Sequence, residues 1–467
     1  MGKNFSILKN ISFTLIAQFS SIIVSLIFSV GVTKIFRVEE YGYWQLFILY
    51  SSYFGFLHFG ICDGLYLKLG GRKFNSLNSN NTSNQFLYYF VIQLCISILF
   101  FGISIILVDD AIKMDMIKYL AVFLLLTNLQ TYLYYTLLST NEIKKYSIAM
   151  LIEKILLIFF IPILYFFFSL GLFDLILLYI IARLLSVLYL IFVLKSKMIK
   201  ISFFDFKNLL IFKIYILNGM FLMFSNVFSS LIIGNTRFFV EEHFGIIAFS
   251  KLSFSISMVN LFVIFIAQVG LVIFPLLRNF STQKVVLFFN PLCSFLNLFF
   301  LIAMFGYYPL KWLIYNYFNT YSESVNALVI LLPICLFEGK MQILYNTYFK
   351  VLRKQKKLFL VNIISLLVSV IVSVFTVYLF SNIDLVLYAL VFSVIFRYLF
   401  CEYILRRELN IGISWMQILP ICIAVIFILF NINDSLWAPL FYLVVMIAYV
   451  LFEYQRGSLN VLLKKEL

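Results

Sequence analysis

The sequence predicts an all-α polytopic membrane protein with about 14 transmembrane helices, arranged as two six-helix bundles around a central cavity plus a C-terminal helix pair. Composition favours this fold class, because 64% of the 467 residues are hydrophobic and only 12% are charged. The mean hydropathy of +1.05 exceeds what a soluble core requires. The apolar residues also form runs of about 20, the length that crosses a hydrocarbon core of roughly 30 Å.

The apolar runs follow one another with short loops between them. The first run is too long for the apolar region of a cleavable signal peptide, and we expect it to remain as a helix. The final pair is less regular, because Asn431, Asn433 and Asp434 leave open a wide turn or a re-entrant dip. We expect helices at 12–36, 43–68, 85–107, 117–139, 147–169, 171–194, 209–234, 244–274, 285–314, 325–350, 358–380, 384–405, 414–432 and 436–454.

The basic residues are distributed asymmetrically along the chain. If the N-terminus is cytoplasmic, most of the 35 Lys and Arg fall in cytoplasmic loops, as at 350–357, and acids gather in external loops, as at 109–115. This is the positive-inside pattern, and it predicts that both termini are cytoplasmic. The net charge of +15 therefore reports topology and contact with anionic membrane lipids. We expect no nucleic-acid partner, because no soluble basic domain exists.

Two pairs of similar stretches recur in the same order. Residues 38–42 read VEEYG and 240–245 read VEEHFG, while KKY at 144–146 resembles KKL at 356–358. These offsets predict a duplicated six-helix unit whose copies share one orientation, as in transporters built from parallel repeats. The corresponding segments are an N-terminal bundle, a C-terminal bundle, and an extra helix pair with a cytoplasmic tail. Their predicted ranges are 1–205, 206–410 and 411–467.

Four basic residues lie inside hydrophobic helices: Arg183, Lys251, Lys340 and Arg397. A cation at the bilayer centre costs about 2.5–3.5 kcal/mol on insertion scales, so these side chains are expected to face a shared polar cavity. Three of them fall about 20 Å from the predicted external helix ends, and Lys251 is shallower. The excess positive charge indicates an anionic substrate bound by these four residues. For Arg183 and Lys251 the alternative is snorkelling or a local pairing.

Asp63 and Glu338 are the carboxylates that we predict well inside helices, and they are the candidates for ion coupling. Each is open to a second interpretation, in which the acid only neutralises a nearby cation. We expect Glu338 to hold Lys340, and Asp63, which lies near His58, to take up a proton. Pro333 is expected to kink the helix that carries Glu338.

Enzyme chemistry receives no support from the sequence. There are only two histidines, and no metal-ligand spacing, phosphate-binding loop or nucleophile motif is present. We therefore predict no catalytic residue, no metal and no cofactor. A membrane glycan-processing enzyme remains the alternative from another functional class, although such enzymes usually carry a large external loop that this chain lacks.

Several stretches along most of the chain resemble one known family. The chain is similar to the Wzx-type polysaccharide (O-antigen) flippases of the multidrug/oligosaccharidyl-lipid/polysaccharide exporter superfamily. The stretches that carry the resemblance are RVEEYGYW at 37–44, FGICDGLYLKLGG at 59–71, NEIKKYSI at 141–148, GNTRFFVEEHFG at 234–245, PLLRN at 275–279, YYPL at 307–310 and the segment 333–353 with Lys340, Lys350 and Arg353.

The resemblance implies a function that agrees with the charge argument. Similar proteins move undecaprenyl-pyrophosphate-linked oligosaccharides, the repeat units of O-antigen, lipopolysaccharide or similar surface polysaccharides, from the cytoplasmic to the periplasmic leaflet of the bacterial inner membrane. Implied partners are this lipid-linked oligosaccharide, H+ or Na+, a polysaccharide polymerase and a chain-length regulator.

The chain departs from the family pattern at two points. Relatives often carry an acid before the arginine that matches Arg237, and this chain has Thr236, so the resemblance implies no ion-coupling role there. Members more often have twelve helices, and the extra C-terminal pair is similar to that of the related lipid II flippases. The alternative within transporters is an ion-coupled multidrug antiporter of the same superfamily, whose cavity should prefer acids.

Overall fold

The structure is entirely helical wherever it describes the chain. It is a computed structural model that describes residues 31–70, 72–107, 110–167, 170–198, 207–278, 282–412, 417–433 and 435–456. Over these residues it contains helices and short connections and no strand, which confirms the all-α prediction. Most of the helix expected at 12–36 lies outside the described residues, and so does Asp434.

The chain divides into two compact units, Met1–Val227 and Phe228–Leu467. The dividing point falls inside α8, Lys207–Arg278, which continues from one unit into the other. The C-terminal helix pair belongs to the second unit. The three segments predicted from the sequence, with boundaries at 205 and 410, remain a prediction.

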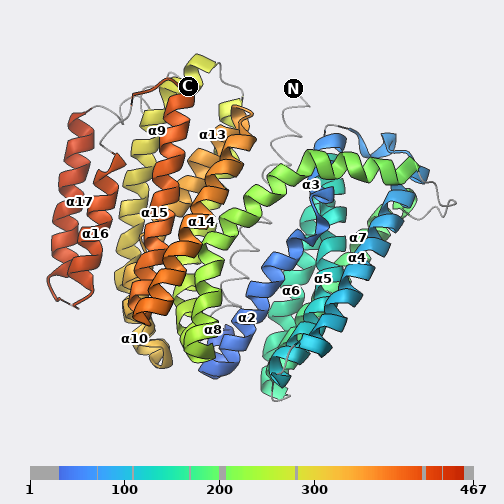
Figure 1. The fold of residues 1–467 in the computed structure, drawn as a ribbon, viewed down its shortest axis with the longest axis horizontal. Coiled ribbons are helices and arrows are strands. Elements are labelled where there is room, and N and C mark those ends of the chain that lie inside the picture. The colour runs from blue at the N-terminus through green and yellow to red at the C-terminus, as the bar shows by residue number, and fades with distance from the viewer. Residues whose placement is uncertain are drawn as a thin grey trace. The chain divides into compact units, whose positions relative to one another are not determined.

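The first unit is built around α5, which packs against α2, α3, α4, α6 and α7 (Figure 1). Its polar side chains turn toward these neighbours, and Asn128, Gln130 and Thr136 are buried. The elements are α2 Val38–Phe54, η1 Gly55–His58, α3 Ile61–Leu69, η2 Phe74–Ser76, α4 Ser79–Leu107, α5 Ala111–Ser139, α6 Ile143–Phe167, α7 Leu172–Met198 and the first part of α8.

The span expected at 43–68 is broken, so the prediction of one continuous helix there is wrong. The stretch Val38–His58 meets α3 at an angle of 56°. The chain turns at Phe59 and Gly60, whose φ angles of 51° and 78° lie in the left-handed region. Gln93 donates to the Leu57 carbonyl at 3.2 Å, which supplies a side-chain donor where the helix ladder is interrupted.

Glycines let α3 and α8 approach closely within the first unit. A Cβ on Gly64 would lie 2.0 Å from the Tyr215 carbonyl oxygen, and one on Gly219 would lie 2.1 Å from the Gly60 oxygen. Gly60 and Gly64 are four residues apart, so they present a gap on one helix face. This is the small-residue packing that brings the backbones of membrane helices together.

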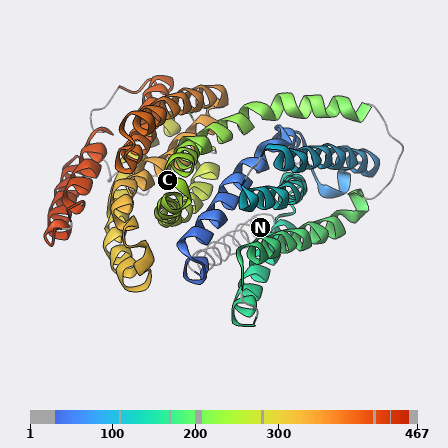
Figure 2. The ribbon, with the colours of Figure 1, turned by 60° about the horizontal axis from the view of Figure 1, so that its bottom comes forward.

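The second unit contains the rest of α8 and the helices that follow it. α8 changes direction at Gly245, where φ is 82° and ψ is 177°. α14 and α15 pack along their length, and α16 and α17 lie side by side (Figure 2). The further elements are α9 Thr282–Ala303, η3 Met304–Gly306, α10 Tyr307–Tyr317, η4 Asn319–Tyr321, α11 Ser324–Leu331, α12 Ile334–Lys340, η5 Met341–Tyr345, α13 Asn346–Val351, α14 Gln355–Phe380, α15 Ile383–Glu408, α16 Leu419–Asn431 and α17 Ala438–Gln455.

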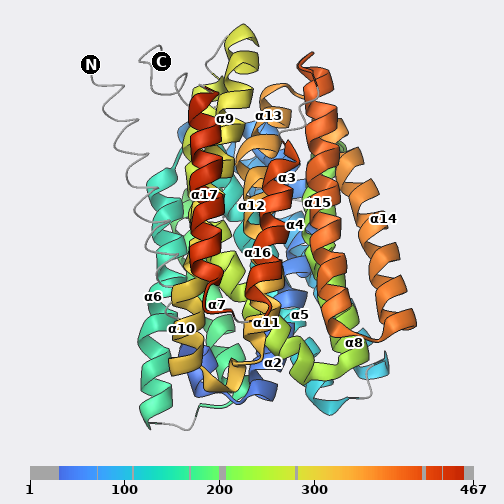
Figure 3. The ribbon, with the colours of Figure 1, turned by 90° about the vertical axis from the view of Figure 1, so that its left-hand side faces the viewer.

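The elements α11, α12, η5 and α13 follow one another along a single bent path (Figure 3). The bend of 41° lies beside Pro333, as the sequence predicts for that residue. Five residues, Met341–Tyr345, then form a π-helix directly after Lys340. Such π-bulges are found frequently at functional sites.

The chain is a multi-pass membrane protein. The described residues contain 8 helices long and apolar enough to cross a membrane, or up to 10 if each bent pair is one span. The predicted count of fourteen is therefore not confirmed. Part of the difference lies in α8, where the helices expected at 209–234 and 244–274 meet at the kink at Gly245 and are counted as one span.

The glycine contact yields a first test. Gly64→Ala forces the new Cβ against the backbone of α8, so we expect a loss of about 1–3 kcal/mol of stability and a lower unfolding temperature in detergent. Gly102→Ala is the matched control, because a Cβ there meets nothing within 4 Å, and alanine favours a helix more than glycine does. Equal unfolding temperatures for the two variants would contradict the close approach of α3 and α8.

Candidate functional site

Lys340 is fully buried in the second unit, with 0% of its surface exposed. Its ammonium Nζ donates to Asn297 Oδ1 at 2.8 Å, to the Tyr398 hydroxyl at 3.1 Å and to Gln417 Oε1 at 3.1 Å. An ammonium has three N–H donors, so all three are used. Within the described part of the chain every one of these partners is a neutral oxygen.

The local structure explains why Lys340 lies where it does. It ends α12, between the bend beside Pro333 and the π-helix. The preceding Gly339 packs tightly, since a Cβ there would lie 2.2 Å from the ring of Phe300. A larger residue at 339 would push α12 away from α9, which carries Asn297. The same packing therefore brings Lys340 within reach of its partners.

Arg397 forms a buried ion pair with Glu338. The other guanidinium nitrogen, Nη1, donates to Ser229 Oγ at 2.8 Å. Only 1% of Arg397 and 8% of Glu338 is exposed. The expectation that Glu338 holds Lys340 is wrong, because residues two apart on a helix point in different directions. Glu338 faces α15 instead, and its second oxygen accepts a hydrogen bond from Gln342 at 3.5 Å.

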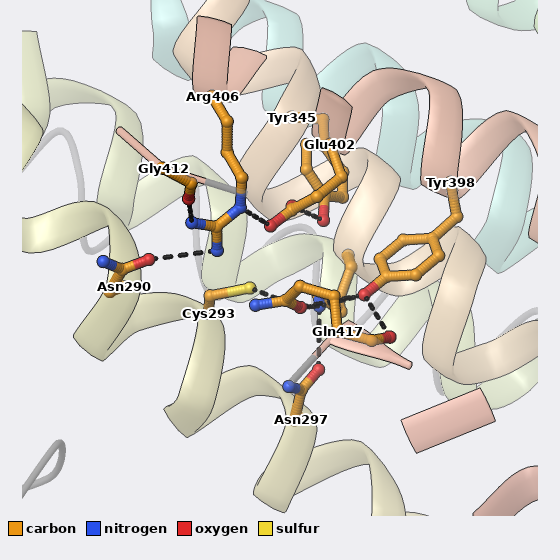
Figure 4. Close-up of polar contacts among 10 residues, drawn as sticks. Asn290, Cys293, Asn297, Tyr345, Tyr398, Glu402, Arg406, Gly412 and Gln417 are labelled. Carbon is orange, nitrogen blue, oxygen red and sulfur yellow. Dashed lines mark hydrogen bonds and ion pairs between the residues drawn. The ribbon is translucent and has the colours of Figure 1, made fainter. Parts of the chain in front are cut away.

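A second ion pair, which the sequence analysis missed, lies close by (Figure 4). Glu402 accepts a hydrogen bond from Arg406 Nε at 2.5 Å and another from the Tyr345 hydroxyl. The remaining guanidinium nitrogens of Arg406 donate to the Gly412 carbonyl at 2.9 Å and to Asn290 Oδ1 at 3.1 Å. Glu402 lies within the helix predicted at 384–405. An acid inside an apolar helix is a sequence signal for a functional or paired charge, and this signal could have identified Glu402.

Arg183 is paired with an acid in the first unit. Its Nε lies 3.0 Å from Glu153 Oε2, and its Nη1 donates to Gln130 Oε1 at 2.7 Å. Gln130 also donates to the Ser186 hydroxyl at 2.8 Å. Glu153 lies inside the helix predicted at 147–169, so the statement that Asp63 and Glu338 are the acids within helices was incomplete.

Lys251 also takes part in an ion pair, with Glu323. This pair is exposed, since 76% of the Glu323 side chain is accessible. The hydrogen bond from Lys251 holds the pKa of the Glu323 carboxyl below its ordinary value. Local pairing, which was the alternative considered for Arg183 and Lys251, is therefore what the structure shows for both residues.

Asp63 lies next to His58, as expected from their positions near the end of the predicted helix. The distance from His58 Nε2 to Asp63 Oδ2 is 3.8 Å, and both side chains are buried. His58 Nδ1 accepts a hydrogen bond from the Gly60 amide at 3.0 Å. That bond places the proton of a neutral imidazole on Nε2, which faces the carboxylate.

These contacts correct the premise that four uncompensated cations line the interior. Arg183, Lys251 and Arg397 each contact a carboxylate. For Arg183 and Arg397 burial makes such pairing favourable, because an isolated ion in a low-dielectric interior costs several kcal/mol. Lys340 differs from the other three, because its hydrogen-bond partners among the described residues are neutral oxygens, and it is the remaining candidate for binding an anion. Within the described residues, no group of three or more His, Cys, Asp and Glu side chains is placed to hold a metal ion.

No protein-family model matches the sequence, and no curated protein matches it either. The fold is nevertheless similar to solved transporters. An inward-facing multidrug resistance MATE family transporter of the MOP superfamily has a TM-score of 0.66 at 12% identity, with 85% of this chain and 98% of that chain covered. The lipid II flippase MurJ in an inward closed conformation has a TM-score of 0.62 at 16% identity, with 96% and 99% covered.

A MOP superfamily transporter from Pyrococcus furiosus also matches, with a TM-score of 0.54 at 13% identity over 86% of this chain and 96% of that chain. At these identities the similarity establishes a common fold. This fold agrees with the superfamily that the sequence resembles, while the narrower resemblance to polysaccharide flippases remains a prediction.

The pair of Arg397 and Glu338 yields a second test. Arg397→Met leaves the Glu338 carboxylate buried without its cation, so we expect a loss of about 3–5 kcal/mol in unfolding free energy. Adding Glu338→Gln should recover most of that loss, measured by unfolding of the purified protein in detergent. Arg456→Met, at an exposed position after α17, is the control and should change little. A double variant whose loss equals the sum of the two single losses would contradict direct pairing.

Proposed function

We propose that this protein is a flippase that moves an undecaprenyl-pyrophosphate-linked oligosaccharide, such as an O-antigen repeat unit, across a bacterial inner membrane. Transport proceeds from the cytoplasmic to the periplasmic leaflet by alternating access, with both termini in the cytoplasm. A polysaccharide polymerase and a chain-length regulator act on the product. The protein itself makes or breaks no covalent bond in this proposal.

The observation that carries the proposal is the environment of Lys340. Its ammonium is buried among neutral oxygens, and an ion in such surroundings is incompletely compensated. A diphosphate supplies the missing negative charge and forms strong charge-assisted hydrogen bonds to a cation. Undecaprenyl-pyrophosphate carriers are the substrates implied by the resemblance of the sequence, and their diphosphate is such an anion.

The extent of the structural matches gives independent support. The match to the lipid II flippase covers 96% of this chain, and the match to the MATE transporter covers 85%. The final segment, 411–467, is too long to lie wholly within the small part of the chain that the flippase match leaves out. At least part of this segment therefore has a counterpart in the lipid flippase, which supports a lipid-linked substrate over a small drug.

The four predicted substrate-binding residues take different roles in this proposal. Lys340 binds the anion directly. Arg397 becomes available to it when Glu338 is protonated or displaced, because a neutral Glu338 no longer holds the guanidinium. Arg183 and Lys251 contribute after release from their own acids, Glu153 and Glu323. Ion coupling by H+ or Na+ is assigned to Glu338 and Asp63.

A multidrug antiporter is the second candidate, favoured by the TM-score of 0.66 to a MATE family transporter. Such a transporter of cationic drugs requires acids that are free to attract its substrate. Three of the buried acids among the described residues, Glu153, Glu338 and Glu402, each contact an arginine. Resistance of cells to cationic dyes on expression of the protein, without any effect on surface glycan, would favour the antiporter.

Loss of the buried cation should stop transport. We expect Lys340→Ala to abolish export of the surface polysaccharide and to leave expression of the protein unchanged, because the diphosphate loses its main counter-charge. Arg397→Ala should reduce export as well. The measurement is surface glycan in a deletion strain that expresses each variant, together with the amount of lipid-linked precursor retained inside.

Lys356→Ala is the matched control, since Lys356 is exposed and lies in the same unit. It should export at the wild-type level. Wild-type export by both Lys340→Ala and Arg397→Ala would refute the anion-binding role of these residues.

The two coupling candidates can be tested by substitution. Glu338→Gln fixes the side chain in its neutral form, so we expect export that no longer depends on the proton gradient. Asp63→Asn should remove proton uptake beside His58 and should also weaken the dependence on the gradient. The measurement is export as a function of an imposed pH gradient in cells or vesicles. Unchanged dependence in both variants would place the coupling site elsewhere.

A further inference from the structure

Three donors converge on one amide oxygen next to Lys340. Gln417 Oε1 accepts hydrogen bonds from the Tyr398 hydroxyl at 2.9 Å, from Lys340 Nζ at 3.1 Å and from Cys293 Sγ at 3.2 Å (Figure 4). A carbonyl oxygen has two lone pairs, so three donors exceed what it accepts well. The donors are thus arranged around a point that suits an acceptor with more lone pairs and more charge.

The three donors lie on helices, whereas the acceptor, Gln417, lies outside them. Cys293 lies on α9, Lys340 ends α12 and Tyr398 lies on α15. All three are fully buried. Asn297, which also accepts from Lys340, is four residues beyond Cys293 and therefore on the same face of α9. Gln417 lies in the short segment that precedes α16.

We infer that this cluster is an oxyanion site and that Gln417 Oε1 occupies the position of a phosphoryl oxygen. The ligand class is the diphosphate of a lipid-linked substrate or free inorganic pyrophosphate, which share the same oxygen chemistry. An anionic oxygen accepts three hydrogen bonds and neutralises Lys340, and such charge-assisted bonds are roughly twice as strong as neutral ones. In its lipid-linked form the inference rests on the proposed function and names the atoms that hold the anion.

In this inference the Gln417 side chain competes with the anion for the three donors. While its side chain fills the site, the buried ammonium keeps a hydrogen-bond partner, and the cation is not left bare inside the protein. An incoming anion must displace the amide of Gln417. The apparent affinity for the anion is therefore the intrinsic affinity multiplied by the fraction of molecules in which the amide has left the site. Because Gln417 precedes α16, displacement also links occupancy of the site to the start of the C-terminal helix pair.

The test measures binding of inorganic pyrophosphate to the purified full chain in detergent, followed by the rise in unfolding temperature with concentration. Gln417→Ala removes the competitor, so we expect a roughly tenfold lower apparent Kd than that of the wild type. Gln417→Glu places a permanent carboxylate on the donors, so we expect no pyrophosphate binding and a higher unfolding temperature without ligand. Lys340→Gln should bind no pyrophosphate.

Gln455→Glu, the same substitution at an exposed position at the end of α17, is the control and should bind like the wild type. If Gln417→Ala is poorly stable alone, stabilisation by pyrophosphate toward the wild-type unfolding temperature supports the site. The inference is overturned if Gln417→Glu binds pyrophosphate as the wild type does, or if pyrophosphate stabilises neither the wild type nor Gln417→Ala.

Undecaprenyl pyrophosphate in the same assay separates the two ligand sources. Tighter binding of the lipid than of inorganic pyrophosphate supports the lipid-linked form, and equal binding supports a site for free pyrophosphate. The two proposals also fail separately. If pyrophosphate binding changes with substitution of Gln417 but the protein has no role in glycan export, the anion site is supported and the flippase proposal is refuted. If export depends on Lys340 but no variant binds the anion, the flippase proposal is supported and the anion site is refuted.

Discussion

The interior of each unit depends on the cost of placing a charged side chain where water is absent. A buried ion costs several kcal/mol unless its partners have excellent geometry. The partners that meet this condition lie on neighbouring helices. Arg183 on α7 contacts Glu153 on α6 and Gln130 on α5, and Arg397 on α15 contacts Glu338 on α12. Apolar packing in a membrane is weakly directional, so these contacts fix which helix faces meet.

The same physics makes the charged contacts suitable for a transport cycle. A buried pair resists separation, yet a proton on the acid or an anion beside the base removes most of the attraction. Glu338 and Arg397 can therefore either contact each other or each contact a different partner. The neighbouring side chains are arranged differently in these two states. Among the described residues the hydrogen-bond partners of Lys340 include no acid. In the proposed function a substrate anion therefore reaches Lys340 without first breaking an ion pair.

The sequence predicted those features that follow from one helix considered alone. Runs of apolar residues indicated where most of the described helices lie, although the span expected at 43–68 is broken. The kink beside Pro333 followed from the missing backbone donor of proline. The partners of the buried cations could not be obtained in this way, because hydropathy does not say which helices are neighbours. Glu153 and Glu402 could have been noticed as acids inside predicted helices, but their pairing with Arg183 and Arg406 could not be predicted. Gln417 could not be identified either, because its contact with Lys340 joins segments that are far apart in the sequence.

The backbone is irregular beside the buried polar groups of both units. An ideal helix in a membrane is stiff, because bending it exposes backbone groups that have no water to bind. Both units contain a span that is already broken: one at Phe59–Gly60, next to His58 and Asp63, and one at Pro333, followed by the π-helix after Lys340. A further change in angle at these points disturbs few intact hydrogen bonds. The charged residues that change partner in the proposed cycle therefore lie beside parts of the backbone that can change angle. A straight helix carrying Glu338 and Lys340 would have to break its own backbone hydrogen bonds to make the same movement.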